Sequence, residues 1–127
     1  MSVYTGFKCE KKLFAIEIKK VIEIIEASKI HYVPKTPVYI KGLVNNRGNI
    51  IPVFDIRGVL SLASENKISH IIVTACNDIS LGLASEVCPI ILPNVPFKES
   101  KKGDIIKGHY KNLGLIDLEK VIEKYKI

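Results

Sequence analysis

The apolar residues of this sequence come in short runs, and turn-forming residues separate one run from the next. Turn signals recur about every eight to twelve residues, a spacing typical of all-β sandwiches and barrels. The longest apolar runs, Ile50 to Phe54 and Cys88 to Pro93, contain proline and are far shorter than the roughly 20 residues of a membrane-spanning helix. We therefore expect many short strands and no membrane span.

Two segments near the N-terminus carry strand patterns. Phe14, Ile16 and Ile18 recur at every second position, which predicts a half-buried strand. The β-branched run Val21 to Ile25 predicts a second strand, because branched side chains fit a pleated surface well. The spacing of that run would also suit a short amphipathic helix, so the period alone leaves both possibilities open.

A hairpin is predicted in the middle of the chain. Gly42 to Arg47 and Asn49 to Asp55 have strand patterns, and Gly48-Asn49 should join them because both residues tolerate the positive φ of a tight hairpin turn. Pro52 has no N–H to donate to a ladder, so it should face outward or lie at an edge or a bulge.

The second half of the chain predicts two more hairpins and a terminal helix. The hairpins consist of Ile71 to Ala75 with Ile79 to Leu83, and of Ile105 to Tyr110 with Leu113 to Asp117. In the last ten residues, Leu118, Val121, Ile122 and Tyr125 have helical spacing. Asp117 can cap the first turn of that helix.

These elements predict an all-β fold of two small five-stranded barrels with short helices and a C-terminal helix. Leu62 to Asn66 is the plausible internal boundary, and it divides a single domain 1–127 into subdomains of about 1–65 and 66–127. About 60 residues are too few for an independently robust core, so the two halves should pack together.

The sequence offers no active site. Its histidines lie in no catalytic motif, its glycines are dispersed, and its acidic residues lack the spacing of a metal site. Cys9, Cys76 and Cys88 include no Cys-x-x-Cys pair, which predicts buried thiols rather than a disulfide framework or a zinc site. We therefore expect neither catalysis nor a cofactor.

The net charge of +6 favours encounters with acidic partners or nucleic acid. A small basic β-barrel that binds single-stranded nucleic acid is accordingly an alternative. Two observations argue against it. The lysines are scattered from Lys8 to Lys126, as on a solvated surface, and Phe14 and Phe54 fall in apolar patterns typical of a core.

One stretch, Val33 to Leu60, reads V-P-K-T-P-V-Y-I-K-G-L-V-N-N-R-G-N-I-I-P-V-F-D-I-R-G-V-L. It closely resembles the central signature of CheW-like domains, in which V-P is followed by P-x-x-I-x-G, N-L-R-G and I-P-V-x-D-L. Leu13 to Ile24 and Leu115 to Ile122 extend the similarity, which covers almost the whole chain. The ordered series of blocks is more specific than any single block.

The resemblance implies two SH3-like β-barrels packed side by side, in agreement with the fold expected from the patterns. It also implies a non-enzymatic chemotaxis adaptor that docks on the regulatory domain of the histidine kinase CheA and on the cytoplasmic tip of methyl-accepting chemoreceptors. Residues 1–12 contain no continuous apolar segment of a secretory signal, which agrees with a cytoplasmic protein at receptor arrays. A monomer that enters larger assemblies is expected.

Four positions match family positions associated with partner contact: Val21 and Glu23 in the V-x-E-I block, Gly42, and Arg47 in the Asn-x-Arg-Gly block. Each has a structural alternative. Val21 can belong to the core, Gly42 can supply backbone freedom, and Arg47 can pair with an acid within the barrel. Glu23 is expected on an exposed face, because a carboxylate is costly to bury unpaired.

Three residues depart from the family pattern. Asn46 stands where leucine is usual, so its side chain would weaken an apolar contact or need a hydrogen-bond partner of its own. Glu86 stands where the family often has aspartate, and Pro89 interrupts the strand that follows. These departures lie at expected docking surfaces.

Overall fold

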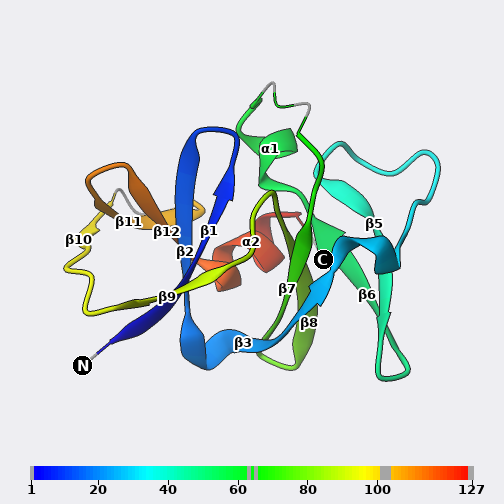
Figure 1. The fold of residues 1–127 in the computed structure, drawn as a ribbon, viewed down its shortest axis with the longest axis horizontal. Helices are drawn as coiled ribbons and strands as arrows, with labels where there is room; N and C mark the ends of the chain where they lie inside the picture. Colours follow the sequence, from blue (N-terminus) through cyan, green and yellow to red (C-terminus); the bar gives the residue numbers. More distant parts are fainter. Residues whose placement is uncertain (1, 63, 65, 101–103, 126–127) are drawn as a thin grey trace.

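The computed structural model describes residues 2–62, 64, 66–100 and 104–125, and within them the strands form two curled sheets of six strands each (Figure 1). Sheet A contains β1 (Val3–Cys9), β2 (Lys12–Glu17), β9 (Ile90–Pro93), β10 (Lys98–Glu99), β11 (Ile106–Tyr110) and β12 (Leu113–Ile116). Sheet B contains β3 (Val21–Glu26), β4 (Ile30–His31), β5 (Ile40–Asn46), β6 (Asn49–Phe54), β7 (His70–Cys76) and β8 (Ile79–Ser85). The short helices are η1 (Ile18–Lys20), η2 (Ala27–Lys29), α1 (Ile56–Val59) and α2 (Leu118–Tyr125).

The expected all-β fold of two SH3-like β-barrel subdomains is confirmed. Sheet A has the order β10-β11-β12-β2-β1-β9, and sheet B has the order β3-β7-β8-β6-β5-β4. In the described residues, each sheet has five strands of four or more residues and one strand of two residues, β10 or β4. Most neighbouring pairs are antiparallel, but β12 with β2 and β6 with β8 are parallel.

The expected boundary at Leu62 to Asn66 does not separate the two sheets. Sheet B takes its strands from residues 21–85, on both sides of that connection. Sheet A joins the first two strands to strands from residues 90–116. The reason is long-range pairing, because β1 and β2 find their neighbours β9 and β12 only at the far end of the chain. Ala63 and Glu65, within the expected boundary, lie outside the described residues.

The central hairpin is confirmed as β5 and β6, but its turn lies one residue earlier than expected. Arg47 (φ 54°) and Gly48 (φ 86°) form the turn, and Asn49 already pairs with Asn46. Positive φ at both positions gives the twist that a two-residue hairpin needs. The Asn45 side chain accepts a hydrogen bond from the Gly48 N–H at 2.9 Å and stabilises the turn.

Pro52 lies between buried Ile51 and Val53, so it faces outward from the curled sheet, as expected. Pairing of β6 with β8 begins only at Val53, and the missing N–H therefore leaves no gap in that ladder. Near the N-terminus, the predicted strand ends at Glu17. Ile18 belongs to η1 and is 38% exposed, which corrects the expectation for that residue.

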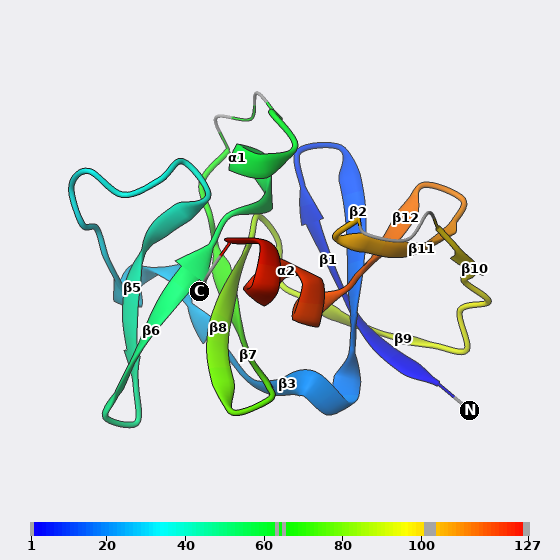
Figure 2. The same ribbon diagram turned by 180° about the vertical axis from the view of Figure 1, so that it is seen from behind.

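A shared apolar core holds the two subdomains together, as expected from the small size of each half. Phe14 and Ile16 of sheet A, Phe54 and Ile72 of sheet B, and Leu118 of α2 belong to one cluster of buried side chains. Figure 2 shows α2 lying across the seam between the two sheets. A second, smaller cluster that includes Val44, Ile51, Val53 and Ile71 fills the inside of sheet B.

The terminal helix is confirmed and is capped as expected. The Asp117 carboxylate accepts a hydrogen bond from the backbone N–H of Lys120 at 3.1 Å. Tyr125 at the other end packs against Tyr39 and Phe54, with ring centroids 4.6 and 5.4 Å away. The longest described helix, α2, therefore connects β12 of one subdomain to the other subdomain. No described helix has the length and apolar character needed to cross a bilayer.

Candidate partner-binding site

All four candidate residues lie in the subdomain formed by sheet B, and two of them form an ion pair. Val21 and Glu23 are on β3, Gly42 is on β5, and Arg47 is in the β5–β6 turn. The structure brings Glu23 and Arg47 together, with 3.5 Å between Oε2 and Nε. Val21 packs against the shared core and Gly42 lies against β4, so their surroundings differ from those of the ion pair.

Glu23 does not lie on the exposed face of β3, which corrects the expectation. Along β3, Val21, Glu23 and Ile25 are half-buried, whereas Ile22, Ile24 and Glu26 are exposed. The carboxylate is nevertheless not unpaired, because Asn46 donates a hydrogen bond from Nδ2 to Oε2 at 2.8 Å. Glu23 thus links β3 to the end of β5, two strands that stand near opposite edges of the sheet order.

The charge on Glu23 is stabilised where it stands. The hydrogen bond from Asn46 lowers the pKa of the carboxyl group, partial burial opposes that shift, and the Arg47 guanidinium lowers the pKa further. Glu23 is therefore ionised at neutral pH. Its side chain is 33% exposed and that of Arg47 is 79% exposed, so both charges can be reached by a partner.

The family pattern, which has leucine at this position, could not predict the contact between Asn46 and Glu23. A polar side chain at this position needs a hydrogen-bond partner, and Glu23 is that partner. The sequence also did not predict the exposed apolar residues next to Glu23. Ile22 is 54% exposed and Ile24 is 40% exposed. The apolar run on β3 carried this signal, but its pattern did not reveal which residues face out.

Val21 and Gly42 have structural roles in this fold. Val21 is half-buried and packs against the shared core. Gly42 is buried beneath β4, where an added Cβ would stand 2.5 Å from the His31 carbonyl oxygen and 2.8 Å from an Ile30 methyl. Only glycine lets β4 pair with β5 so closely, and the structural alternatives for these two residues account for their surroundings.

A buried polar network lies where the two subdomains meet. Arg57 pairs with Asp55 at 2.8 Å and with Glu86 at 3.0 Å, and all three side chains are less than 10% exposed. Glu86 also accepts hydrogen bonds from the Ser64 hydroxyl at 2.8 Å, and from the Glu10 backbone N–H at 2.8 Å in the β1–β2 turn. The network therefore ties sheet A to α1 and to the connection after it.

The network stabilises the charged forms of Arg57 and Glu86. Hydrogen bonds with Asp55 raise the pKa of the Arg57 guanidinium, against the effect of burial. Burial also opposes ionisation of Glu86, but hydrogen bonds from Ser64, Asn66 and the Glu10 N–H lower its pKa overall. Glu86, which stands where the family often has aspartate, thus lies at the buried contact between the two subdomains.

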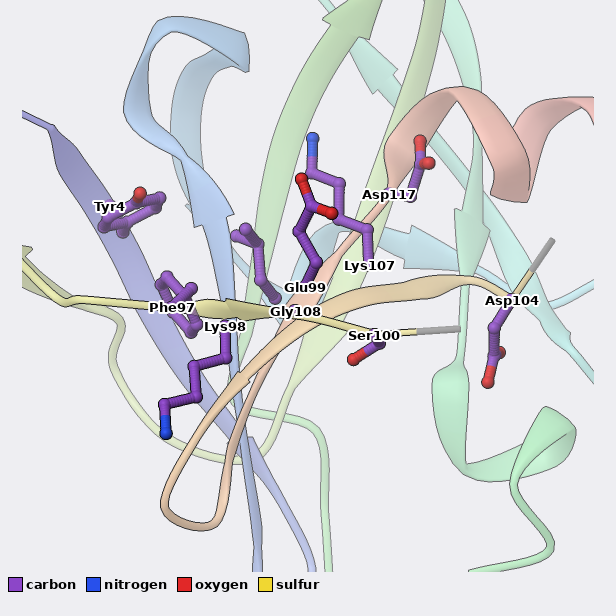
Figure 3. A pocket seen from close by; sticks show the side chains of 10 residues that line it. Tyr4, Phe97, Lys98, Glu99, Ser100, Asp104, Lys107, Gly108 and Asp117 are labelled. Atoms are coloured by element: carbon purple, nitrogen blue, oxygen red, sulfur yellow. The ribbon is translucent and has the colours of Figure 1, made fainter. Parts of the chain in front are cut away.

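A depression of about 460 Å³ on sheet A lies between Tyr4 and Asp117. Figure 3 shows that its charged side chains do not converge on one point, since Lys98, Asp104 and Asp117 point in different directions. Lys107 already binds Glu17 at 2.8 Å. Among the described residues, no group of three or more His, Cys, Asp or Glu side chains could hold a metal ion.

The described geometry defines a protein of two SH3-like subdomains whose polar surface site is an ion pair at the rim of one sheet. Residues 4–124 match the family model of the CheW-like domain. The chain therefore belongs to the CheW-like domain family, as the sequence blocks implied.

Known proteins agree with this assignment. The chain is 29% identical to a chemotaxis protein CheW of Thermotoga maritima over an alignment of 133 positions, and this alignment covers 96% of this chain and 88% of the relative. It is 31% identical to a chemotaxis protein CheW of Bacillus subtilis, with 93% and 85% covered. The crystal structure of the scaffolding protein TtCheW from Thermoanaerobacter tengcongensis superposes with a TM-score of 0.79 at 22% identity, covering 92% of this chain and 84% of that one.

Proposed function

We propose that this chain is a chemotaxis adaptor that couples methyl-accepting chemoreceptors to the histidine kinase CheA. The observation that carries the proposal is the match to the CheW-like family over residues 4–124. The adaptor works by binding alone, without a chemical step, a cofactor or contact with nucleic acid. It acts in the cytoplasm, as a monomer that joins receptor arrays at the inner face of the membrane.

We assign partner contact to the rim of sheet B around Glu23 and Arg47. The Asn46 hydrogen bond and the ion pair hold the Glu23 carboxylate in one position, so it is preorganised for a partner. The Arg47 side chain is largely exposed and keeps donors available for a partner carboxylate. Exposed Ile22 and Ile24 on the same strand add apolar surface that a partner can cover.

Val21 and Gly42 hold in place the strands that form this surface. Val21 anchors the start of β3 on the shared core, and Gly42 allows β4 to lie against β5. Substitutions at these two positions would change binding by moving the strands that carry Glu23 and Arg47. Modest affinities at several such contacts suffice in an array, because linked contacts strengthen one another.

The test is binding of the purified chain to two probes, the regulatory domain of CheA and a chemoreceptor cytoplasmic fragment. Glu23→Lys and Arg47→Ala should each weaken binding to at least one probe about ten-fold, as expected for residues near the centre of an interface. Arg47→Ala should unfold in urea close to the midpoint of the parent chain. Glu23→Lys should remain folded with a modestly lower midpoint, because it loses the hydrogen bond from Asn46. Lys120→Ala, in a partly exposed pair on α2, is the control and should bind normally.

A single-stranded oligonucleotide is the third probe. Absence of binding to both protein probes would contradict the adaptor proposal. Salt-sensitive binding to the oligonucleotide alone would replace it with a nucleic-acid-binding barrel, because contacts to phosphates weaken steeply with salt.

A further inference from the structure

An apolar groove of about 210 Å³ opens at one end of sheet A, away from the strands that carry Glu23 and Arg47. Strands β1, β2, β9 and β12 and the connection before β9 contribute to it. Its apolar lining includes Leu13, Phe14, Val87, Ile90, Leu92 and Leu113. Three of these side chains are exposed to solvent, Leu13 at 37%, Val87 at 39% and Ile90 at 60%.

Three lysines that form no ion pair with the described residues lie in or next to this groove. Lys8 lines it, and Lys11 and Lys12 line the neighbouring hollow that shares Leu13 and Phe14 with the groove. In the part of the chain that the structure describes, none of these three lysines lies within 4.0 Å of a carboxylate, whereas Lys20 and Lys107 both pair with Glu17. Cations left unpaired beside apolar surface favour an anionic partner.

The acidic residues near the groove do not cancel this charge. Glu86 is buried and its carboxylate is occupied by Arg57 and the hydrogen bonds around it. Glu10, in the β1–β2 turn, is half-buried, so the described residues set one further carboxylate against three lysines here. The local potential at this end of sheet A is therefore positive.

The size of the groove limits what can enter it. Pockets for small-molecule ligands usually measure about 300–1,000 Å³, so this groove is too small for most of them and suits about one or two apolar side chains. A second copy of this chain would bring the same lysines face to face, which like-charge repulsion disfavours. The remaining occupant is a segment of another protein.

We infer that this groove docks an acidic segment of a partner protein, with one or two apolar side chains in the groove and flanking carboxylates on Lys8, Lys11 and Lys12. This surface lies on a different subdomain from the proposed receptor and kinase contacts at Glu23 and Arg47. It gives the adaptor a further contact for a partner whose docking segment combines leucine or phenylalanine with aspartate or glutamate.

Cys88 provides a direct readout, because it lines the groove and is exposed, whereas Cys9 and Cys76 are buried. The probe is a synthetic peptide of about twelve residues with Leu and Phe anchors between Asp and Glu residues. We expect it to bind in calorimetry and to slow maleimide labelling of Cys88. A peptide with lysines in place of the acids should bind at least about ten-fold more weakly.

Two variants test the groove separately from the proposed function. Lys8→Glu combined with Lys12→Glu should reverse the preference between the two peptides, and Glu23→Lys should leave peptide binding unchanged. Equal binding of both peptides, or unchanged labelling of Cys88 at saturating acidic peptide, would overturn the inference. Because Glu23 and the groove lie on different sheets, loss of receptor or kinase binding in Glu23→Lys reports on the adaptor surface alone.

Discussion

Arg57 is a buried cation that two carboxylates, Asp55 and Glu86, neutralise at the junction of the subdomains. Its side chain also donates a hydrogen bond to the Asn66 carbonyl oxygen at 2.8 Å. Buried pairs of this kind contribute little net stability compared with apolar residues, but removal of one partner leaves the others buried without compensation. The arginine therefore has a large effect on stability when it is replaced.

Arg57→Met should lower the free energy of unfolding by about 3–5 kcal/mol, because two buried carboxylates lose their cation. Urea denaturation followed by circular dichroism measures this difference. The control is Lys120→Met, which removes a partly exposed pair with Glu123 at 3.8 Å and should cost less than about 1 kcal/mol. Similar losses in the two variants would show that the network does not stabilise the junction.

Asn46 controls the ionisation of Glu23, so Asn46→Leu should raise the pKa of that carboxyl group toward its ordinary value. Because the pKa of Glu23 is lower in the folded chain, its ionised carboxylate stabilises the fold at pH values above the ordinary pKa of glutamate. This stabilisation is lost as the pH falls through the folded-state pKa. An NMR titration of the Glu23 side chain measures the shift. Lys41→Gln on the same strand is the control, and an unchanged pKa in Asn46→Leu would contradict the assignment.

The sequence predicts local elements well, such as hairpins of consecutive strands and the terminal helix. The hairpins β5–β6, β7–β8 and β11–β12 and the capped helix α2 agree with local patterns, because turn residues and periodicity act over a few positions. The turn at Arg47-Gly48 differs by one residue, since the register also depends on Asn46 pairing with Asn49.

The candidate site was predictable only in part for the same reason. The family pattern pointed to Glu23 and Arg47, and the structure brings them together. It could not reveal which face of β3 carries Glu23, because β3 is apolar on both faces. Nor could it reveal the network of Arg57 and Glu86, whose members are far apart in sequence and meet only in the folded chain.

The pairing of β4 with β5 depends on Gly42, so Gly42→Ala should separate these strands. The added methyl group would overlap the His31 carbonyl oxygen, and overpacking of this kind costs about 1–3 kcal/mol. Hydrogen exchange should become faster at the amides of Ile30 and Val44, which pair across the two strands. Gly48→Ala, at a position with open space, is a control for added volume, although positive φ strains it modestly. Unchanged exchange in Gly42→Ala would contradict this close contact.

The molecule as a whole should unfold in one step, because its largest cluster of buried side chains belongs to both subdomains and to α2. The chain contains no Trp and five Tyr, so tyrosine fluorescence and far-ultraviolet circular dichroism are suitable probes. Their urea transitions should coincide in midpoint and slope. Two separate transitions would show that each subdomain has a core that is stable alone.

The distribution of strands between the sheets also has a consequence for synthesis. The β1–β2 hairpin leaves the ribosome early, but the parallel neighbour of β2 lies in β12, about 100 residues later. At about 5–20 residues per second, that neighbour is made on the order of 5–20 s afterwards. All strands of sheet B lie within residues 21–85 and are therefore made during this interval. We therefore expect the nascent chain to expose Phe7 and Phe14 until β12 has been made, a period in which a chaperone can bind them.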